Sequence, residues 1–222
     1  MTDIKLNINN LRKQIPSEVK LVAVSKTKPV SDILDAYNAG QRIFGENRVQ
    51  ELLKKKDLLP ADIEWHLIGH LQTNKVKLIV PFVSMIQSVD SFRLIKTIND
   101  EARKTGRTVN CLLQLHIARE ETKFGFSFSE VNEMLGDIAS RTLDSIRICG
   151  VMGMATFTDD KDMVREEFRY LADCFRKLKT AYFINDEGFK EISMGMSGDF
   201  AIAISEGSTM VRIGSLIFGE RN

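Results

Sequence analysis

Short apolar runs alternate with segments of helical period along the chain, and this alternation constrains the fold more than any other feature. The apolar runs are rich in Val, Ile, Leu and Met, which is typical of strands in a sheet covered on both faces. The predicted strands are 20–25, 42–46, 64–69, 84–89, 108–117, 146–155, 191–196 and 210–218. The predicted helices between them are 30–39, 48–58, 74–80, 91–105, 128–140, 160–180 and 198–205. Strands alternating with helices indicate parallel βαβ units.

Eight such strands with intervening helices favour a closed (β/α)8 barrel of the TIM type over an open doubly wound sheet. An open sheet usually carries a Gly-rich turn after its first strand, and here that turn is SKTKP. Ile4, Ile8, Leu11 and Ile15 recur at helical spacing, which predicts an extra N-terminal helix before the barrel. At 222 residues the chain is within the size range of this fold, and we predict one domain over residues 1–222.

Composition and charge exclude several classes of function. The net charge of +1 gives no overall field that would attract nucleic acid or an acidic membrane. No apolar run approaches the roughly 18 residues of a membrane span, and the N-terminus lacks the apolar core of a secretion signal. The three cysteines, Cys111, Cys149 and Cys174, are widely spaced, so we expect buried thiols in a reducing cytoplasm rather than disulfides or a zinc cluster.

Turns of small residues follow the last two predicted strands. In a barrel, function lies at the carboxyl ends of the strands, and the loops after strands seven and eight frequently hold a phosphate. Ser197 and Gly198 lie in the first turn, with a predicted helix starting near Gly198, and Gly214 and Ser215 lie in the second. Either turn alone could be an ordinary helix cap, but two on adjacent strands favour a phosphate site.

Lys26 ends the apolar run LVAVSK, the first predicted strand. Strands one and eight are neighbours in a closed barrel, so this amine should lie near the predicted phosphate. A phosphate beside a partly desolvated lysine indicates either a phosphorylated aldehyde cofactor bound as a Schiff base or an aldolase that forms one with its substrate. Desolvation and nearby Arg212 would lower the pKa of the amine towards its reactive neutral form.

Arg212 is a cation within the apolar run VRIGSLIF. It could snorkel and pair with a carboxylate of a helix, which periodicity alone favours. It could instead point inward and contact a ligand, either at a phosphate or at a pyridine nitrogen.

These residues belong to an ordered set of motifs: SKTKP, FGEN, VQE, WHLIGHLQTNK, SVDS, ETKFG, MGMA, SMGMSGDF and GSTMVRIGSLIFG. In this order, over residues 20 to 219, they resemble the pyridoxal phosphate homeostasis protein family. That family is similar to the isolated N-terminal barrel of alanine racemase. Any one motif is weak, whereas the ordered set is highly specific.

The resemblance implies that pyridoxal 5′-phosphate (PLP) is held as an internal aldimine on Lys26. It implies phosphate binding by Ser197, Gly198, Gly214 and Ser215 with Arg212 alongside, and a ring pocket lined by Asn47, Ile68, Ser88 and Met196. It also implies a cytoplasmic monomer that serves PLP homeostasis with little or no turnover and no catalytic residues. PLP-dependent apoenzymes, or amino and keto acids, are candidate partners. The chain departs from the family pattern at Arg48, where Tyr is common, and at His116, which puts the role of His116 in the pocket in doubt.

Other candidate groups are weaker. His66 and His70 are four residues apart but straddle a strand end, and no carboxylate or cysteine pattern supports a metal site there. Glu46 and Glu51 could form an acid/base pair, but Glu51 is expected on a solvated helix face. Lys28 is an alternative amine that we expect to be solvated, and Lys123 is another, in a polar loop.

Three functions remain open from the sequence. The first is a PLP carrier, the second a slow PLP-dependent racemase or lyase, and the third a cofactor-free Schiff-base aldolase. A racemase needs a second acid/base group opposite the lysine. Tyr37, Tyr170 and Tyr182 fall in predicted helices or at their ends rather than at strand ends, and the sequence ends after strand eight, so we expect no such group.

Overall fold

The structure, a computed structural model, describes residues 3–119, 124–138 and 143–220. Its strands are β1 (Lys20–Val24), β2 (Ile43–Glu46), β3 (Glu64–Leu67), β4 (Met85–Val89), β5 (Val109–Gln114), β6 (Ile146–Met152), β7 (Glu191–Ser193) and β8 (Met210–Ile213). They pair in sequence order into a closed barrel. The barrel closes where β8 runs parallel to β1, with Lys20 opposite Met210 and Ala23 opposite Ile213. The predicted TIM-type barrel is therefore confirmed.

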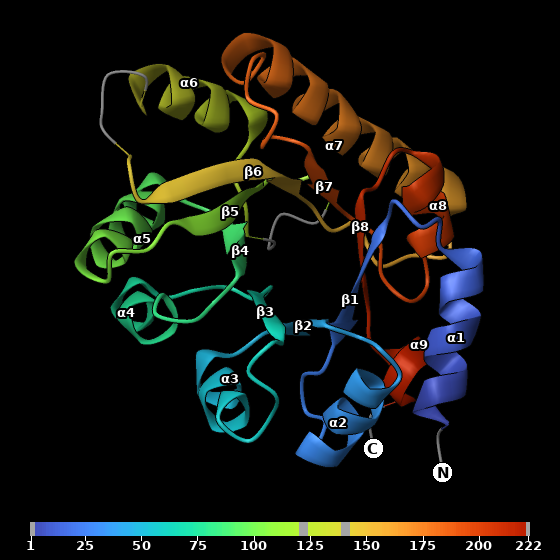
Figure 1. Cartoon of the computed structure of the whole chain (residues 1–222). Coiled ribbons are helices and arrows are strands. Elements are labelled where there is room, and N and C mark those ends of the chain that lie inside the picture. Colours follow the sequence, from blue (N-terminus) through green and yellow to red (C-terminus); the bar gives the residue numbers. More distant parts are fainter. Residues whose placement is uncertain (1–2, 120–123, 139–142, 221–222) are drawn as a thin grey trace.

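Helices follow the strands and surround the barrel (Figure 1). They are α1 (Ile4–Gln14), α2 (Val30–Asn38), α3 (Val49–Lys56), α4 (Val76–Ile79), α5 (Phe92–Lys104), α6 (Phe128–Ile138), α7 (Lys161–Tyr182), α8 (Phe200–Ser205) and α9 (Ser215–Phe218), with a 3-10 helix η1 (Thr73–Lys75) before α4. None of the described helices is both long enough and apolar enough to cross a membrane.

The extra N-terminal helix is confirmed as α1. The Asp3 carboxylate accepts a hydrogen bond from the Leu6 amide and caps its first turn. Ile4, Ile8 and Leu11 form its buried face, as their spacing predicts. Helix α1 lies beside α9, near the labelled ends of the chain (Figure 1), and the two are joined by a hydrogen bond from Asn7 Nδ2 to the Ile217 carbonyl (3.0 Å).

Six of the eight strands end earlier than the sequence predicts, and the early ends of β8 and β7 shape the predicted site. Strand β8 stops at Ile213 instead of residue 218, because the last part of its apolar run folds into α9. A short apolar run fits a buried strand or a buried helix equally well, so periodicity could not separate the two. Strand β7 stops at Ser193, and Gly195 then turns the chain with φ of 96°. A Cβ at Gly195 would lie 2.6 Å from Ala203 Cβ, so this turn requires glycine.

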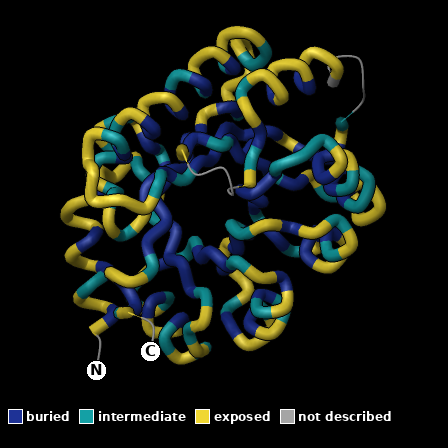
Figure 2. The backbone as a smooth tube through the Cα atoms, turned by 180° about the vertical axis from the view of Figure 1, so that it is seen from behind, coloured by how far each residue is buried: buried dark blue, intermediate teal, exposed yellow. Residues whose placement is uncertain are grey.

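The apolar core forms two layers. The larger lies between the barrel and the helices, where Phe44, Phe168 and Phe189 are fully buried. The smaller fills the barrel and contains Val22, Met85, Leu112, Cys149, Met152 and Met210. Figure 2 shows the buried strands inside a ring of helices that expose their outer faces. The three cysteines are buried and free of disulfides, as predicted.

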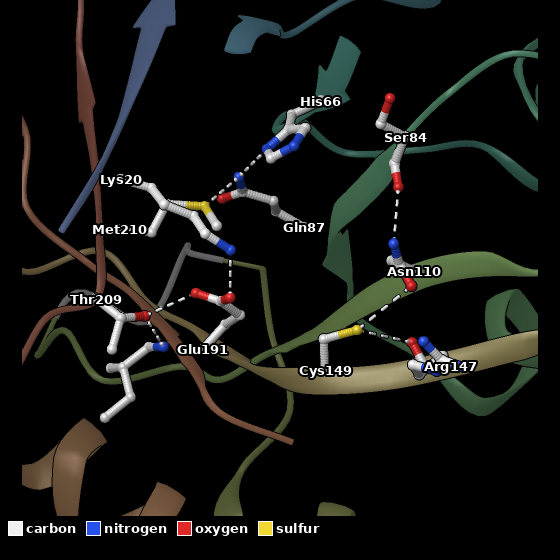
Figure 3. A network of polar contacts seen from close by, with 11 residues as sticks. Lys20, His66, Ser84, Gln87, Asn110, Arg147, Cys149, Glu191, Thr209 and Met210 are labelled. Atoms are coloured by element: carbon white, nitrogen blue, oxygen red, sulfur yellow. Dashed lines mark hydrogen bonds and ion pairs between the residues drawn. The ribbon is translucent and has the colours of Figure 1, made fainter. Parts of the chain in front are cut away.

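Polar side chains close the amino-terminal end of the barrel. Lys20 Nζ lies 2.5 Å from Glu191 Oε1, and the Thr209 hydroxyl donates to Glu191 Oε2 (Figure 3). These residues begin or precede β1, β7 and β8, so the network lies at the end opposite to the predicted site. In barrels of this type the functional site lies at the carboxyl ends of the strands.

Candidate functional site

A cavity of about 410 Å³ lies at the carboxyl ends of the strands. Nine of the ten predicted site residues line it: Lys26, Asn47, Ile68, Met196, Ser197, Gly198, Arg212, Gly214 and Ser215. They come from the ends of β1, β2, β3, β7 and β8, elements far apart in sequence. The barrel brings these residues together as expected.

The tenth residue, Ser88, does not reach the cavity's described lining. It is fully buried in β4, and its hydroxyl donates to the Gly69 carbonyl (2.6 Å). Gly69 approaches the Asn47 backbone so closely that a Cβ would lie 2.4 Å from the Asn47 carbonyl oxygen. Ser88 therefore supports the wall that carries Asn47.

Lys26 lies in a tight turn just past β1 and is half-buried. The Lys28 amide donates to the Ser25 carbonyl (3.0 Å), which closes a β-turn over residues 25–28. Thr27, the third residue of this turn, has φ of 65° and is the one non-glycine residue with a positive φ in the described ranges. A β-branched residue in this conformation is strained, and such strain often occurs at functional sites.

Side chains of α3 and β2 form hydrogen bonds with this turn and with one another. Lys55 Nζ donates to the Ser25 carbonyl (2.8 Å), to Glu46 Oε1 (2.7 Å) and to Glu51 Oε1 (2.7 Å). The Ser25 hydroxyl donates to Glu46 Oε1 (2.6 Å). Burial raises the pKa of Glu46 above its ordinary value, while Lys55 and Ser25 oppose that shift.

Arg212 points into the barrel and does not snorkel towards solvent. Its side chain is buried, and its guanidinium donates to the Ser193 hydroxyl (2.7 Å) and the Gly153 carbonyl (3.0 Å). Burial lowers the pKa of Arg212 to about 10, and the nearby Asp199 carboxylate opposes the shift. The group therefore stays charged at neutral pH and presents a cation to the cavity.

A chain of buried hydrogen bonds fixes Arg212 from within. The Ser193 hydroxyl, which accepts from Arg212, donates to Gln87 Oε1 (2.7 Å). Gln87 Nε2 lies 2.9 Å from His66 Nδ1, and Figure 3 shows Gln87 between His66 and Met210. Burial lowers the pKa of His66 to about 3, so its ring is neutral and Nδ1 can accept. The chain thus links Arg212 through Ser193 and Gln87 to His66.

The turn after β7 differs from its prediction. Helix α8 begins at Phe200 rather than near Gly198 and has six residues, so it adds little dipole to the site. The Asp199 carboxylate accepts from the Met196 amide (2.5 Å) instead of capping α8. Asp199 also lines the cavity, and burial raises the pKa of its carboxyl group.

Two features of the cavity fit a polar ligand. Asn47 Oδ1 is a buried atom with no hydrogen-bond partner among the described residues. An unpaired buried carbonyl is costly, so a ligand donor would stabilise this position. A Cβ at Gly198 would meet no atom within 4 Å, so protein packing leaves the space above this glycine open.

The structure also bears on the other lysines and on His116, which the sequence singled out. Lys28 is not simply solvated, because its ammonium donates to the Phe218 carbonyl (2.9 Å) and ties the C-terminal segment to the cavity wall. Lys123 lies outside the described residues. His116 does not belong to the cavity's described lining.

The two histidines considered as metal ligands face different partners. His66 is buried against Gln87, whereas His70 is exposed and its Nδ1 lies 2.7 Å from Asp90 Oδ2. In the described ranges no three His, Cys, Asp or Glu side chains gather as metal ligands would.

Sequence reasoning missed Lys55 and Asp199 and assigned Glu51 to the wrong environment. Glu51 was expected on a solvated face, but its carboxylate accepts from the Thr27 amide (2.5 Å). The Glu-to-Lys spacing of four residues in the helix was a visible signal for this pair. Nothing in the sequence separated Asp199 from an ordinary N-cap residue.

Comparison with known proteins supports a relationship over the whole chain. The model of the alanine racemase N-terminal domain family matches residues 1–222. The pyridoxal phosphate homeostasis protein of Pasteurella multocida is 39% identical over 230 residues, covering 100% of this chain and 96% of that protein.

Solved structures agree with these matches. PipY of Synechococcus elongatus, with PLP bound, has a TM-score of 0.89 and 34% identity, covering 97% of this chain and 100% of that chain. An alanine racemase of Clostridium difficile has a TM-score of 0.76 at 14% identity, covering 99% of this chain and 57% of that chain. The second likeness extends to the fold alone.

Proposed function

We propose, from the premise that this chain belongs to the pyridoxal phosphate homeostasis protein family, that it binds PLP and serves intracellular PLP homeostasis. One observation carries the proposal: Lys26 and the buried cation of Arg212 line one cavity together with two turns of small residues. PLP offers an aldehyde, an anionic phosphate and a ring nitrogen, and this cavity presents an amine, a cation and polar turns.

Lys26 is the proposed tether. Its amine nitrogen would attack the aldehyde carbon, and a C=N bond would form as the carbonyl oxygen leaves in one water molecule. The turn over residues 25–28 places Lys26 in the cavity wall beside Asn47, whose unpaired Oδ1 would gain a partner from a ligand donor. When bound, PLP supplies a ring that can take up electrons from an attached amine.

The turns after β7 and β8 are the proposed phosphate site. Ser197 and Ser215 offer hydroxyl donors, and Gly198 and Gly214 let the backbone approach a ligand closely. Arg212 lies beside them and would contact either the phosphate or the ring nitrogen. Ile68 and Met196 would line the ring, while Ser88 would act through the wall behind Asn47.

We infer that turnover is low, and that the protein acts as a cytoplasmic monomer whose candidate partners are apoenzymes or amino and keto acids. Tyr37, Tyr170 and Tyr182 lie on outer helices, and Tyr37 and Tyr182 bond to Asp62 and Asn132 rather than facing the cavity. This arrangement favours a carrier.

One observation favours the alternative, a slow racemase or lyase. Asp199 lines the cavity, and its raised pKa brings it nearer to the range of a proton donor. If the protein is an enzyme, Asp199 is the described carboxyl group best placed to act opposite Lys26.

Equilibrium dialysis against PLP, followed by a panel of amino acids, tests the function. The proposal predicts about one bound PLP per chain and product that does not exceed one equivalent. Failure to bind PLP would overturn the proposal. Sustained turnover that is lost in Asp199→Asn would replace the carrier with the enzyme.

A further inference from the structure

The third residue of the turn that carries Lys26 has a backbone conformation that is unfavourable for its residue type. Positive φ at this position normally calls for Gly or Asn. Here it is Thr27, with φ of 65°. Strain of this kind persists only where surrounding groups hold the backbone in place.

Helix α3 provides those groups on both sides of Lys26. The amide that follows Lys26, that of Thr27, donates to Glu51 Oε1 (2.5 Å). The carbonyl that precedes it, that of Ser25, accepts from Lys55 Nζ (2.8 Å). The two peptide groups that flank Lys26 are therefore both bonded to side chains one helical turn apart.

The two α3 side chains are themselves fixed. Glu51 and Lys55 form an ion pair of 2.7 Å, and Lys55 forms a second of 2.7 Å with Glu46, which is fully buried. All three N–H donors of the Lys55 ammonium are used. A lysine held in this way has little freedom to shift, so it is a rigid support for the turn.

We propose that Glu51 and Lys55 are positioning residues that hold the strained turn and thereby direct the Lys26 amine into the cavity. This inference rests on the proposed role of Lys26 as the PLP tether. Neither side chain belongs to the cavity's described lining, so both act on a ligand only through Lys26.

Capture of PLP by Lys26 tests the proposal. Borohydride is added at increasing times after the protein is mixed with PLP, and it reduces the adduct formed by then. Peptide mapping of these samples gives the rate at which PLP is captured on Lys26. Glu51→Ala should slow capture by about tenfold, the factor that corresponds to about 1.4 kcal/mol, since it releases one side of the strained turn. Glu51→Gln keeps an acceptor for the Thr27 amide, so its capture rate should fall less than that of Glu51→Ala. Circular dichroism establishes that each variant is folded.

Two further variants distinguish a loss of positioning from a general loss of stability. Glu101→Ala removes an exposed ion pair of α5 with Lys104 and should leave the capture rate unchanged. Thr27→Gly removes the strain, so adding it to Glu51→Ala should restore the rate to within about threefold of the parent.

Hydrogen exchange reports on the same turn without PLP. The Thr27 amide should exchange faster in Glu51→Ala than in the parent and the Glu101→Ala control. Equal capture rates in Glu51→Ala and the parent, or no rescue by Thr27→Gly, would overturn the positioning role. Failure of the parent itself to capture PLP would instead overturn the proposed function.

Discussion

Replacing Lys55 with methionine should strongly destabilise the protein. The ammonium is buried and bonds to Ser25, Glu46 and Glu51. Without it, the fully buried Glu46 carboxylate loses its cation, and breaking a buried pair by removing one partner costs about 3–5 kcal/mol. Domains of this kind have about 5–15 kcal/mol in total, so a large share of the stability is lost.

Thermal and urea unfolding measure this loss. For a chain of this length, 1 kcal/mol shifts Tm by about 2–4 °C, so Lys55→Met should lower Tm by about 6–20 °C. The matched control adds Glu46→Gln, which removes the stranded charge and should recover more than half of the loss.

The pH dependence gives a second measure of the same change. Burial already raises the pKa of Glu46 above its ordinary 4.5, and loss of Lys55 raises it further. A raised folded pKa favours the protonated folded state, so the defect of Lys55→Met should shrink as the pH falls towards 4.5. A loss below about 1 kcal/mol, or a double variant no more stable than the single one, would refute this reasoning.

Two further predictions concern the turn after β7 and the barrel interior. Gly195→Ala should lower the free energy of unfolding, measured in urea, by at least about 3 kcal/mol, because its Cβ would meet Ala203. Gly207 has the same φ of 96° but lies in open space, so Gly207→Ala should lower it by only about 1 kcal/mol. Equal losses in the two variants would contradict this prediction. Burial lowers the pKa of His66 from its ordinary 6.5 to about 3. Between these two pH values the unfolded chain binds a proton at His66 and the folded chain does not. The free energy of unfolding therefore falls as the pH falls through this window. His66→Gln should flatten this slope by up to about 1.4 kcal/mol per pH unit, and an unchanged slope would contradict the neutral histidine.

The barrel and most of the lining of the candidate site could be predicted because they follow from the order of elements along the chain. Parallel strands carry their carboxyl ends to one rim, so naming the strand ends also named Lys26, Gly198 and Gly214 as neighbours. The family resemblance supplied the residues expected to line a ring pocket, and of these Ser88 alone is absent from the cavity's described lining.

The remaining features depend on tertiary contacts that no local pattern encodes. The apolar run before Phe218 fits strand or helix, and only packing of α9 against α1 decides it. Glu51 is polar on a helix, which normally indicates a solvated position, and only the tertiary fold brings its carboxylate to the Thr27 amide. The orientation of Arg212 likewise depends on Ser193, whose partner Gln87 comes from another strand.

The central claim is that Lys26 tethers PLP. Its most direct test is borohydride reduction of the protein incubated with PLP, followed by peptide mass mapping of the parent and of Lys28→Ala. We predict one adduct per chain, on Lys26, in both proteins, and none at this site in Lys26→Ala. An adduct mainly on Lys28 or Lys123, or no adduct at all, would contradict the claim.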